Sequence, residues 1–408
     1  MRFELTDQQR DLMATVRGFL ADRYPLAAVR AGYDDPADDG DPSALWKAAG
    51  EQGWLAVCVP EEYDGLGLGL LDAAVLARCW GAGVVPGSIL PTLLAAEAVR
   101  LAGSVEQQAA WLPQVAAGTV RLALAAGDGA PDTPEIGVTA TPAGTVRGTL
   151  TGRAAFVEYA AGADRLVVAA LDASPAGGSG TGGSDTGGSG VGGSGVGGSA
   201  AGGPGAGGAG GGGSAISLWL VDPAGPGTIV TPHAALDRTT RLYTVDFDEA
   251  AAKRLAGSSA AVLAAVLDRA AVLAANELVG IAREALTRTV DYGKTREQFG
   301  RPVGSFQAVK HALADLHVAT TMAEHAGWYA AHAIDEALPD APLAASVAKA
   351  KATEAARDAT AAMIQYHGGI GYAWEHDTHF YFKRAKRLEY QYGDQAQHLE
   401  RIARLIID

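Results

Sequence analysis

Few of the features that mark specialised classes of protein occur in this sequence. Only two cysteines, Cys58 and Cys79, occur among 408 residues. They show no metal-ligand spacing, so we expect neither a disulfide framework nor a metal site. No uninterrupted apolar run is long enough to span a bilayer. The N-terminal MRFELTDQQRDLMATVRGFL lacks a basic region followed by an apolar stretch, which argues against a signal peptide. These absences predict a cytoplasmic protein with no membrane span.

Positive charge is also scarce. The formal net charge is −14 at pH 7, which argues against a nucleic-acid-binding surface. A local concentration of basic residues, KRAKR, lies at positions 383–387. Two interpretations are open: the cluster is the solvated face of a helix, or it binds a phosphate-bearing ligand. The length of the chain separately indicates two or three packed units.

The sequence contains a change of pattern near residue 120 and another near residue 258. Before the first change, apolar residues recur at helical spacing, and Thr6 is the predicted N-cap of the first helix. We predict an N-terminal helical domain over residues 1–118. Its further helices are predicted at about 41–53, 71–80, 90–101 and 105–117.

The middle of the chain, residues 119–257, is predicted to be a β domain. Stretches such as TVRGTLTG and AAFVEYA alternate apolar and polar residues between turn formers, which predicts an antiparallel sheet or barrel. Residues 174–214 are almost wholly Gly, Ser and Ala. Such a composition has little to bury, so we predict a disordered insertion between two strands, without a chemical role.

The remainder, residues 258–408, returns to helical spacing. One helix is predicted through Asp291, another from Phe306, a third over 342–366 and a last one after Asp394. Four such helices with intervening loops predict an antiparallel bundle. The predicted fold class is therefore mostly α, with a central β domain.

Two polar motifs fall at loops of this bundle. In KTREQFGRPVG, Arg296 precedes a helix N-terminus, a combination that suits a pyrophosphate, and Phe299 can lie against an aromatic ring. In QYHGGIGY, Gly368 and Gly369 end a helix and expose backbone to which a ligand can come close. The alternative is an ordinary interhelical loop and a helix C-cap.

These motifs carry a resemblance to a known family. REQFGRPVGSFQAVKH (296–311) and QYHGGIGYAWEHDTHFYFKRAK (365–386), together with the helical–sheet–helical order, resemble the acyl-CoA dehydrogenase flavoproteins. The resemblance implies an acyl-CoA thioester substrate and an electron-transfer flavoprotein as electron acceptor. It also implies a homodimer, homotetramer or heterotetramer in which the loops of one subunit reach the FAD of another. The implied FAD contacts are Arg296, Phe299, Gln307, Gln365, Gly368 and Gly369.

The family reaction needs a carboxylate that removes an α-proton, because burial can raise the pKa of a carboxyl group toward neutrality. In this alignment Tyr392 takes the position of the usual glutamate, and Ala270 takes the position that a few members use instead. Tyrosine, with a pKa of about 10, is a poor base. Asp394 is a better candidate than Glu389, although it also suits the N-cap of the last helix.

The segments expected to contact the flavin ring also differ from the family pattern. Thr-Glu-Pro, Gly-Ser-Asp and Trp-Ile-Thr are missing from AAGDGAPDTPE (125–135) and AAFVEYAAGADR (154–165), where Phe156 stands in for the Trp. Two hypotheses follow from the resemblance. The chain is a complete acyl-CoA dehydrogenase with an unusual base, or it is a catalytically incomplete partner subunit of a heteromeric enzyme. A third, a flavin fold recruited for another reaction, has no support in the sequence.

Overall fold

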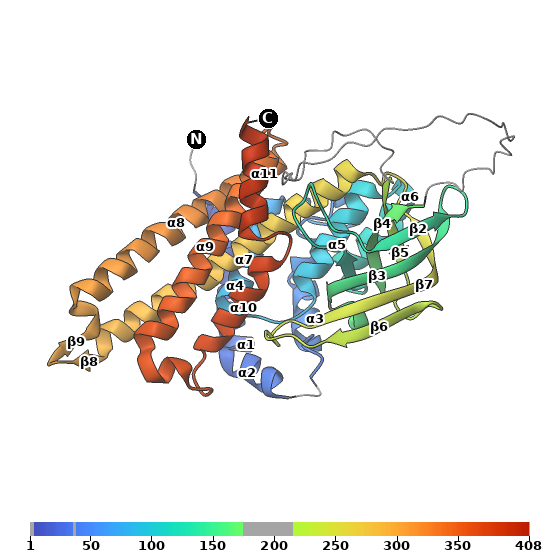
Figure 1. The fold of residues 1–408 in the computed structure, drawn as a ribbon. Coiled ribbons are helices and arrows are strands. Elements are labelled where there is room, and N and C mark those ends of the chain that lie inside the picture. Colours follow the sequence, from blue (N-terminus) through green and yellow to red (C-terminus); the bar gives the residue numbers. More distant parts are fainter. Residues whose placement is uncertain (1–3, 36–37, 174–214, 408) are drawn as a thin grey trace, which may run out of the picture.

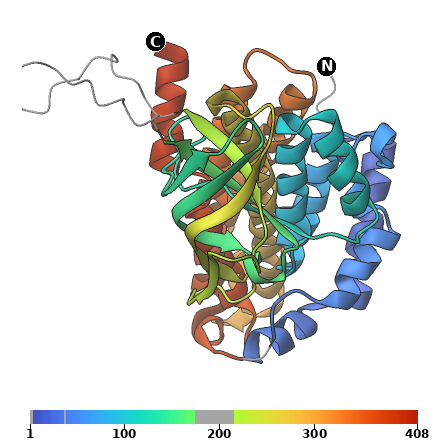
Figure 2. The ribbon, with the colours of Figure 1, turned by 90° about the vertical axis from the view of Figure 1, so that its right-hand side faces the viewer.

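Helices from both ends of the chain pack against each other and against the central sheet (Figure 1). The computed structural model describes residues 4–35, 38–173 and 215–407. Figure 2 shows the sheet in front, with the N-terminal helices on its right and the C-terminal helices on its left. No helix of the described residues is both long and apolar enough to cross a membrane.

The N-terminal helices confirm the predicted helical character of this part of the chain. Thr6 caps the first helix by accepting a hydrogen bond from the backbone N–H of Gln9, and Ser104 does the same for Gln107. The short helix α2 was not predicted; no side chain caps its start, so the sequence carries no start signal. The helices are α1 (Asp7–Arg23), α2 (Leu26–Asp34), α3 (Ser43–Glu51), α4 (Leu70–Gly83), α5 (Ile89–Ala102) and α6 (Val105–Ala116).

The sheet closes on itself as a barrel, because β5 pairs with both β4 and β7. The predicted antiparallel sheet or barrel is confirmed for most strand pairs, and the exceptions are the parallel pairs of β4 with β1 and β2. Alternation of apolar and polar residues identifies strands but carries no information about their relative direction. The strands are β1 (Leu122–Ala125), β2 (Val138–Pro142), β3 (Arg147–Glu158), β4 (Arg165–Asp172), β5 (Ile216–Val221), β6 (Thr228–His233) and β7 (Leu242–Arg254).

Strand β3 joins two stretches that the sequence predicted as separate strands. Its register with β7 shifts twice, and Gly152 and Phe156 have φ angles of +127° and +56°. The break in alternation is therefore a pair of bulges, which bend the strand without ending it. Glu158 is the last residue of this strand, at the boundary with the helices. The predicted insertion at 174–214 lies outside the described residues, between the antiparallel strands β4 and β5.

The C-terminal helices contain one helix more than the four predicted. Among residues 258–407, as described, α10 lies between the predicted third and fourth helices. Close packing of α7 against α9 uses their many buried alanines. A short hairpin of β8 (Glu297–Gln298) and β9 (Arg301–Pro302) connects α7 to α8. The helices are α7 (Ala260–Thr295), α8 (Gln307–Asp335), α9 (Ala341–His367), α10 (Thr378–Tyr390) and α11 (Gln395–Ile407).

Two apolar cores organise the molecule. One extends through both groups of helices and covers the outer side of β4 and β5, through residues such as Val167 and Leu218. The other fills the barrel around the fully buried Trp219. The C-terminal end of α10 reaches the boundary between these cores, where it meets the end of β3.

Candidate functional site

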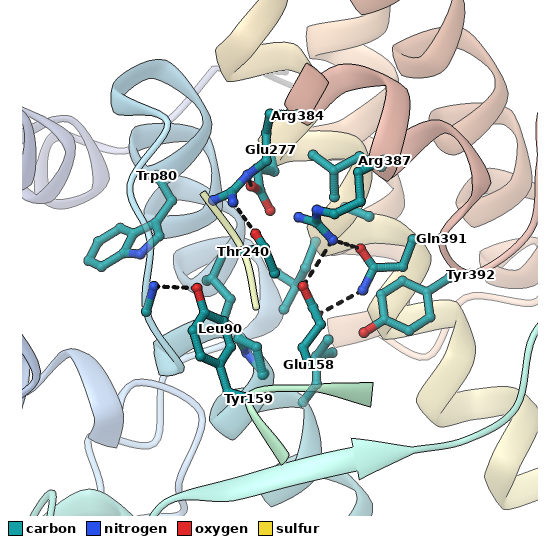
Figure 3. A pocket seen from close by; sticks show the side chains of 16 residues that line it. Trp80, Leu90, Glu158, Tyr159, Thr240, Glu277, Arg384, Arg387, Gln391 and Tyr392 are labelled. Atoms are coloured by element: carbon teal, nitrogen blue, oxygen red, sulfur yellow. Dashed lines mark hydrogen bonds and ion pairs between the residues drawn. The ribbon is translucent and has the colours of Figure 1, made fainter. Parts of the chain in front are cut away.

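A cluster of buried charged side chains lies where the sheet meets the bundle. Glu158 comes from the end of β3, Asp237 from the segment before β7, and Arg387 and Gln391 from the end of α10. Figure 3 shows Glu158, Arg387 and Gln391 pointing toward one another between a strand and a helix. These side chains therefore join the β domain to the bundle.

Arg387 is the centre of this cluster. Its Nη1 donates to Oε1 of Glu158 at 2.9 Å, and its Nε donates to Oδ2 of Asp237 at 3.1 Å. Gln391 closes the ring, because its Nε2 donates to Oε2 of Glu158 at 2.8 Å while its Oε1 accepts a hydrogen bond from Arg387. Only about a tenth of the Arg387 side chain is exposed. Such charge-assisted bonds, shielded from water, are strong.

Arg384, one turn earlier on α10, joins the same region to the N-terminal helices. Its Nη2 donates to the Val85 carbonyl oxygen at 2.6 Å, and its Nε donates to Oε1 of Glu277 at 2.7 Å. Its Nη1 donates to the hydroxyls of Thr239 and Thr240. Burial opposes the charge of Arg384, but Glu277 and Asp237 outweigh burial and raise its pKa. Arg384 is thus a permanent cation contacting every part of the fold.

These contacts answer the question that the basic cluster KRAKR left open. Arg384 and Arg387 are buried in ion pairs, so neither a solvated face nor a phosphate site describes them. Lys386 pairs with Glu389 at 2.8 Å, and Lys383 donates to the Tyr33 hydroxyl at 2.8 Å. The sequence could not show that the two arginines are buried, because their acidic partners lie more than 100 positions away along the chain.

Two cavities lie on either side of the charged cluster. The first, about 30 Å³, is lined by Trp80, Leu90 and Leu273 among others. That volume holds one or two waters and no acyl chain. The second, about 240 Å³, lies along Leu124–Asp128 and Ala155–Glu158. The side chains that separate them, and that line both, are Glu158, Arg387, Gln391 and Tyr392.

Tyr392, a predicted catalytic candidate, lies on a tightly held turn. It has a φ of +58° and Gly393 a φ of +96°, a conformation that non-glycine residues rarely adopt. Burial and then the charge of Glu158 raise the pKa of the Tyr392 hydroxyl well above its ordinary value. Lys349 donates to the carbonyl oxygens of Glu389 and Gly393 at 3.1 and 2.8 Å, fixing the turn. A phenol in this setting does not take up a substrate proton.

The other candidate bases have different surroundings. Oδ1 of Asp394 accepts a hydrogen bond from the backbone N–H of Gln397 at 2.8 Å, and Oε1 of Gln397 accepts one from the backbone N–H of Asp394 at 2.9 Å. This is a capping box at the start of α11. Ala270 is fully buried inside α7. Sequence reasoning missed Glu158 and Asp237; the signal in the sequence was that Glu158 stands where the family motif has a threonine.

All six predicted FAD contacts are exposed, at the opposite end of α10 from the charged cluster. Figure 1 shows the β8–β9 hairpin at the end of the bundle away from the sheet. The side chain of Phe299 is 92% exposed. A Cβ added to Gly368 or Gly369 would meet no atom within 4 Å. Tyr292 stacks on His367 with ring centroids 4.4 Å apart, which ties the two predicted loops together. The six are Arg296, Phe299, Gln307, Gln365, Gly368 and Gly369.

A groove beside these loops runs between α7 and α8. It has a volume of about 910 Å³ and combines apolar residues such as Leu286 and Leu313 with the cations Lys294 and Lys310. Ser305 lines it as well, and the Ser305 hydroxyl is buried without a hydrogen-bond partner. Open glycine backbone, an exposed arginine and an orphaned hydroxyl fit the phosphates of a dinucleotide. The loop end therefore fits the nucleotide part of FAD.

The charged cluster does not fit the reacting part of FAD and an acyl chain. A ring in the second cavity could meet an acyl thioester in the first only through a space that Glu158, Arg387 and Gln391 already fill. In the segments 125–126 and 155–157, the second cavity presents alanine, phenylalanine and valine side chains, which offer no hydroxyl to a flavin edge; its hydroxyls come from Tyr390 and Tyr392 at the end of α10.

The turn at Tyr392 also predicts a pH dependence of stability. His398 is fully buried, and its Nε2 donates to the Tyr392 carbonyl oxygen at 2.9 Å. Burial, and next the charge of Lys349, lowers the pKa of His398 to about 3. The unfolded histidine has a pKa of about 6.5, so below that pH the unfolded state binds more protons. The free energy of unfolding is therefore expected to fall by roughly 2 kcal/mol between pH 6.5 and pH 5.

Urea unfolding of wild type and His398→Gln at these two pH values measures this effect. The glutamine keeps an N–H donor but cannot titrate. The fall in the free energy of unfolding between pH 6.5 and pH 5 should therefore be smaller in the variant by roughly 2 kcal/mol. Titration of Lys349 does not interfere with this measurement. Burial lowers the pKa of Lys349 to about 7, so its effect on the free energy of unfolding develops as the pH falls from about 10.5 to about 7. Equal losses in both proteins would contradict the assignment to His398.

Comparisons with known proteins show similarity over most of the chain. The acyl-CoA dehydrogenase N-terminal domain model matches residues 6–119, and the C-terminal domain model matches residues 258–407. Acyl-CoA dehydrogenase IpdE2 of Mycobacterium tuberculosis is 32% identical over 380 residues, 93% of this chain and 91% of that protein. A variant of the Tcur3481–Tcur3483 steroid ACAD superposes with a TM-score of 0.80 at 29% identity, covering 98% of each chain. The ChsE4–ChsE5 complex of Mycobacterium tuberculosis gives a TM-score of 0.82 at 24% identity, covering 100% of this chain and 99% of that one, a likeness of fold.

Proposed function

The chain belongs to the acyl-CoA dehydrogenase family, FAD-dependent oxidoreductases acting on acyl-CoA, and we propose that it serves this reaction as the partner subunit of a heteromeric enzyme. In the proposed assembly, its bundle end completes the FAD site of a paralogous, catalytic chain. The α,β-desaturation of the acyl-CoA thioester then takes place in the cleft of that neighbour.

The observation that carries the proposal is that the six predicted FAD contacts are exposed while ion-paired side chains close the cleft of this chain. All six are exposed and come before α10 in the sequence, and Gly368 and Gly369 lie in the turn that leads into it. The cleft of this chain lies at the other end of α10. A helix of 13 residues is about 20 Å long, so the loops and the cleft are well separated. Loops that extend away from their own cleft suit a nucleotide held by a neighbour.

The cleft itself does not present the unpaired carboxylate that the reaction requires, because Glu158, Asp237 and Glu277 are all held in ion pairs. Neither Tyr392 nor Ala270 supplies a carboxylate, and Asp394 caps α11. Removal of an α-proton leaves an enolate, and FAD supplies the acceptor for the hydride. The cleft holds the cations Arg384 and Arg387, but the three carboxylates of Glu277, Asp237 and Glu158 surround them. An excess of buried negative charge disfavours a developing anion.

Similar proteins support a heteromeric assembly and a bulky acyl group. The names Tcur3481–Tcur3483 and ChsE4–ChsE5 each describe two different chains, and the first is called a steroid ACAD. We extend both features to this chain: a heterotetramer with a paralogue, and an acyl-CoA thioester of steroid or fatty-acid origin. We also place the enzyme in the cytoplasm and assign its electrons to an electron-transfer flavoprotein.

Expression of the full-length chain alone and together with a paralogue tests this function. Alone, the purified chain should be colourless and should not act on acyl-CoA, because its loops lack the cleft that holds the flavin ring. Co-purified with the paralogue, it should be yellow and should bleach when acyl-CoA is added. Flavin absorbance near 450 nm measures both states. A yellow chain that bleaches on its own would show instead a complete enzyme.

A further inference from the structure

The cleft of this chain is filled by its own side chains. We infer that Glu158, Asp237, Arg387 and Gln391 form a latch that closes the cleft against a flavin ring and an acyl chain. The inference deepens the proposed function and rests on it, since a subunit whose loops serve a neighbour has no need of an open cleft.

The latch bridges two rigid walls. Glu158 ends a strand whose hydrogen bonds to β7 run up to that residue, and Arg387 lies within α10. Asp237 is 2% exposed and accepts a further hydrogen bond from the backbone N–H of Thr239 at 3.0 Å. The positions of both carboxylates are thus fixed by contacts other than those with Arg387. A bridge between fixed ends loses little entropy when it forms.

The latch also divides what would otherwise be one space. Glu158, Arg387 and Gln391 line both the cavity of about 30 Å³ and the cavity of about 240 Å³. The smaller cavity contains an unsatisfied polar group. Trp80 lines it and is 1% exposed, and the indole N–H of Trp80 has no hydrogen-bond acceptor. Figure 3 shows Trp80 and Tyr159 on one side of this space and Arg387 and Gln391, with Glu158 pointing toward them, on the other. Removing the latch side chains would join the two cavities.

The latch is strong enough to exclude a ligand. A ring entering between Glu158 and Arg387 has to break several hydrogen bonds to charged groups, which lowers its affinity by roughly a hundred- to a thousandfold. The turn behind Gln391 cannot yield, because Lys349 and His398 hold the carbonyl oxygens of Glu389, Tyr392 and Gly393.

Riboflavin tests the latch, because it carries the flavin ring without the adenosine and phosphates that the loops are proposed to bind. The protein is the full-length chain, and quenching of riboflavin fluorescence reports binding. Wild type is expected to bind riboflavin at least tenfold more weakly than Glu158→Ser/Arg387→Leu, in which both charges leave together. Gln391→Ala, a milder change, should fall between them and serves if the double variant does not fold.

The matched control is Arg153→Leu/Asp246→Ser, which removes an exposed ion pair between β3, the strand of Glu158, and its neighbour β7, and should bind like wild type. Equal riboflavin affinity in wild type and a folded latch variant overturns the inference, whether both bind or neither does. The proposed function fails separately. A chain that is yellow and active alone refutes the partner role, whereas equal riboflavin affinities beside a yellow co-purified assembly refute the latch alone.

Discussion

Arg384→Leu is expected to lower the free energy of unfolding by about 3–5 kcal/mol, because it leaves the buried carboxylate of Glu277 without its cation. Glu277 is 6% exposed, so water cannot replace the guanidinium, whereas Asp237 keeps its ion pair with Arg387. The Val85 carbonyl and two threonine hydroxyls lose a donor as well. A typical domain is stable by about 5–15 kcal/mol, so the variant should be near the limit of folding at 37 °C.

Urea unfolding followed by circular dichroism measures this loss. Arg153→Leu removes an arginine of the same size from an ion pair on the surface, where its side chain is 67% exposed. Exposed pairs contribute about 0–1 kcal/mol, so this control should unfold close to wild type. A third variant, Arg384→Lys, keeps the charge without the planar fork and should lie between the two. Equal midpoints for Arg384→Leu and Arg153→Leu would show that the buried network does not join the parts of the fold.

The second large effect concerns the loops. Arg296→Ala combined with Phe299→Ala is expected to weaken FAD binding by the co-purified assembly roughly a hundredfold or more. A charge-assisted hydrogen bond to phosphate contributes about 1.5–3 kcal/mol, and stacking of an aromatic ring on a base about 1–3 kcal/mol. Both side chains are exposed in the single chain, so their loss should leave its stability unchanged.

Flavin content after gel filtration, and titration of the apoprotein with FAD, give the measurement. Arg23→Ala combined with Val105→Ala removes an exposed arginine and an exposed apolar residue from the N-terminal helices, and should retain FAD as wild type does. Full flavin retention by the loop variant would place the nucleotide elsewhere. An intact heteromer that has lost its colour is the expected result.

The parts of this fold that could be predicted from sequence are those that depend on local patterns. Helical spacing and the Thr6 cap located α1, and the paired glycines Gly368 and Gly369 located the end of α9. The relative direction of neighbouring strands could not be predicted. The run of consecutive buried residues in β4 would look the same beside a parallel or an antiparallel neighbour. The helix α2 was missed because it has no capping side chain.

The candidate site shows the same limit more sharply. The loop motifs lie within short segments, so sequence alone could single out residues such as Arg296 and Gly368. The latch joins Glu158 to Arg387 across 229 positions of the chain. Charges so far apart in sequence become partners only through the closed barrel and the packed bundle. The residues around KRAKR do not distinguish a buried arginine from a solvated one. The cluster was therefore interpreted as a solvated helix face or a phosphate-binding site.

The proximity of Glu158 to Tyr392 bears on how this subunit can evolve. Under the proposed function, a mutation Tyr392→Glu would place a carboxylate where the family resemblance puts the glutamate, but Glu158 already lies in the same buried space. Two carboxylates there would share one proton, and Arg387 would hold the other charge. Loss of Glu158 alone would leave Arg387 short of a partner, so each single step toward an active cleft costs stability first. Under the proposed function, a return to an active cleft therefore requires coordinated changes at Glu158 and Tyr392.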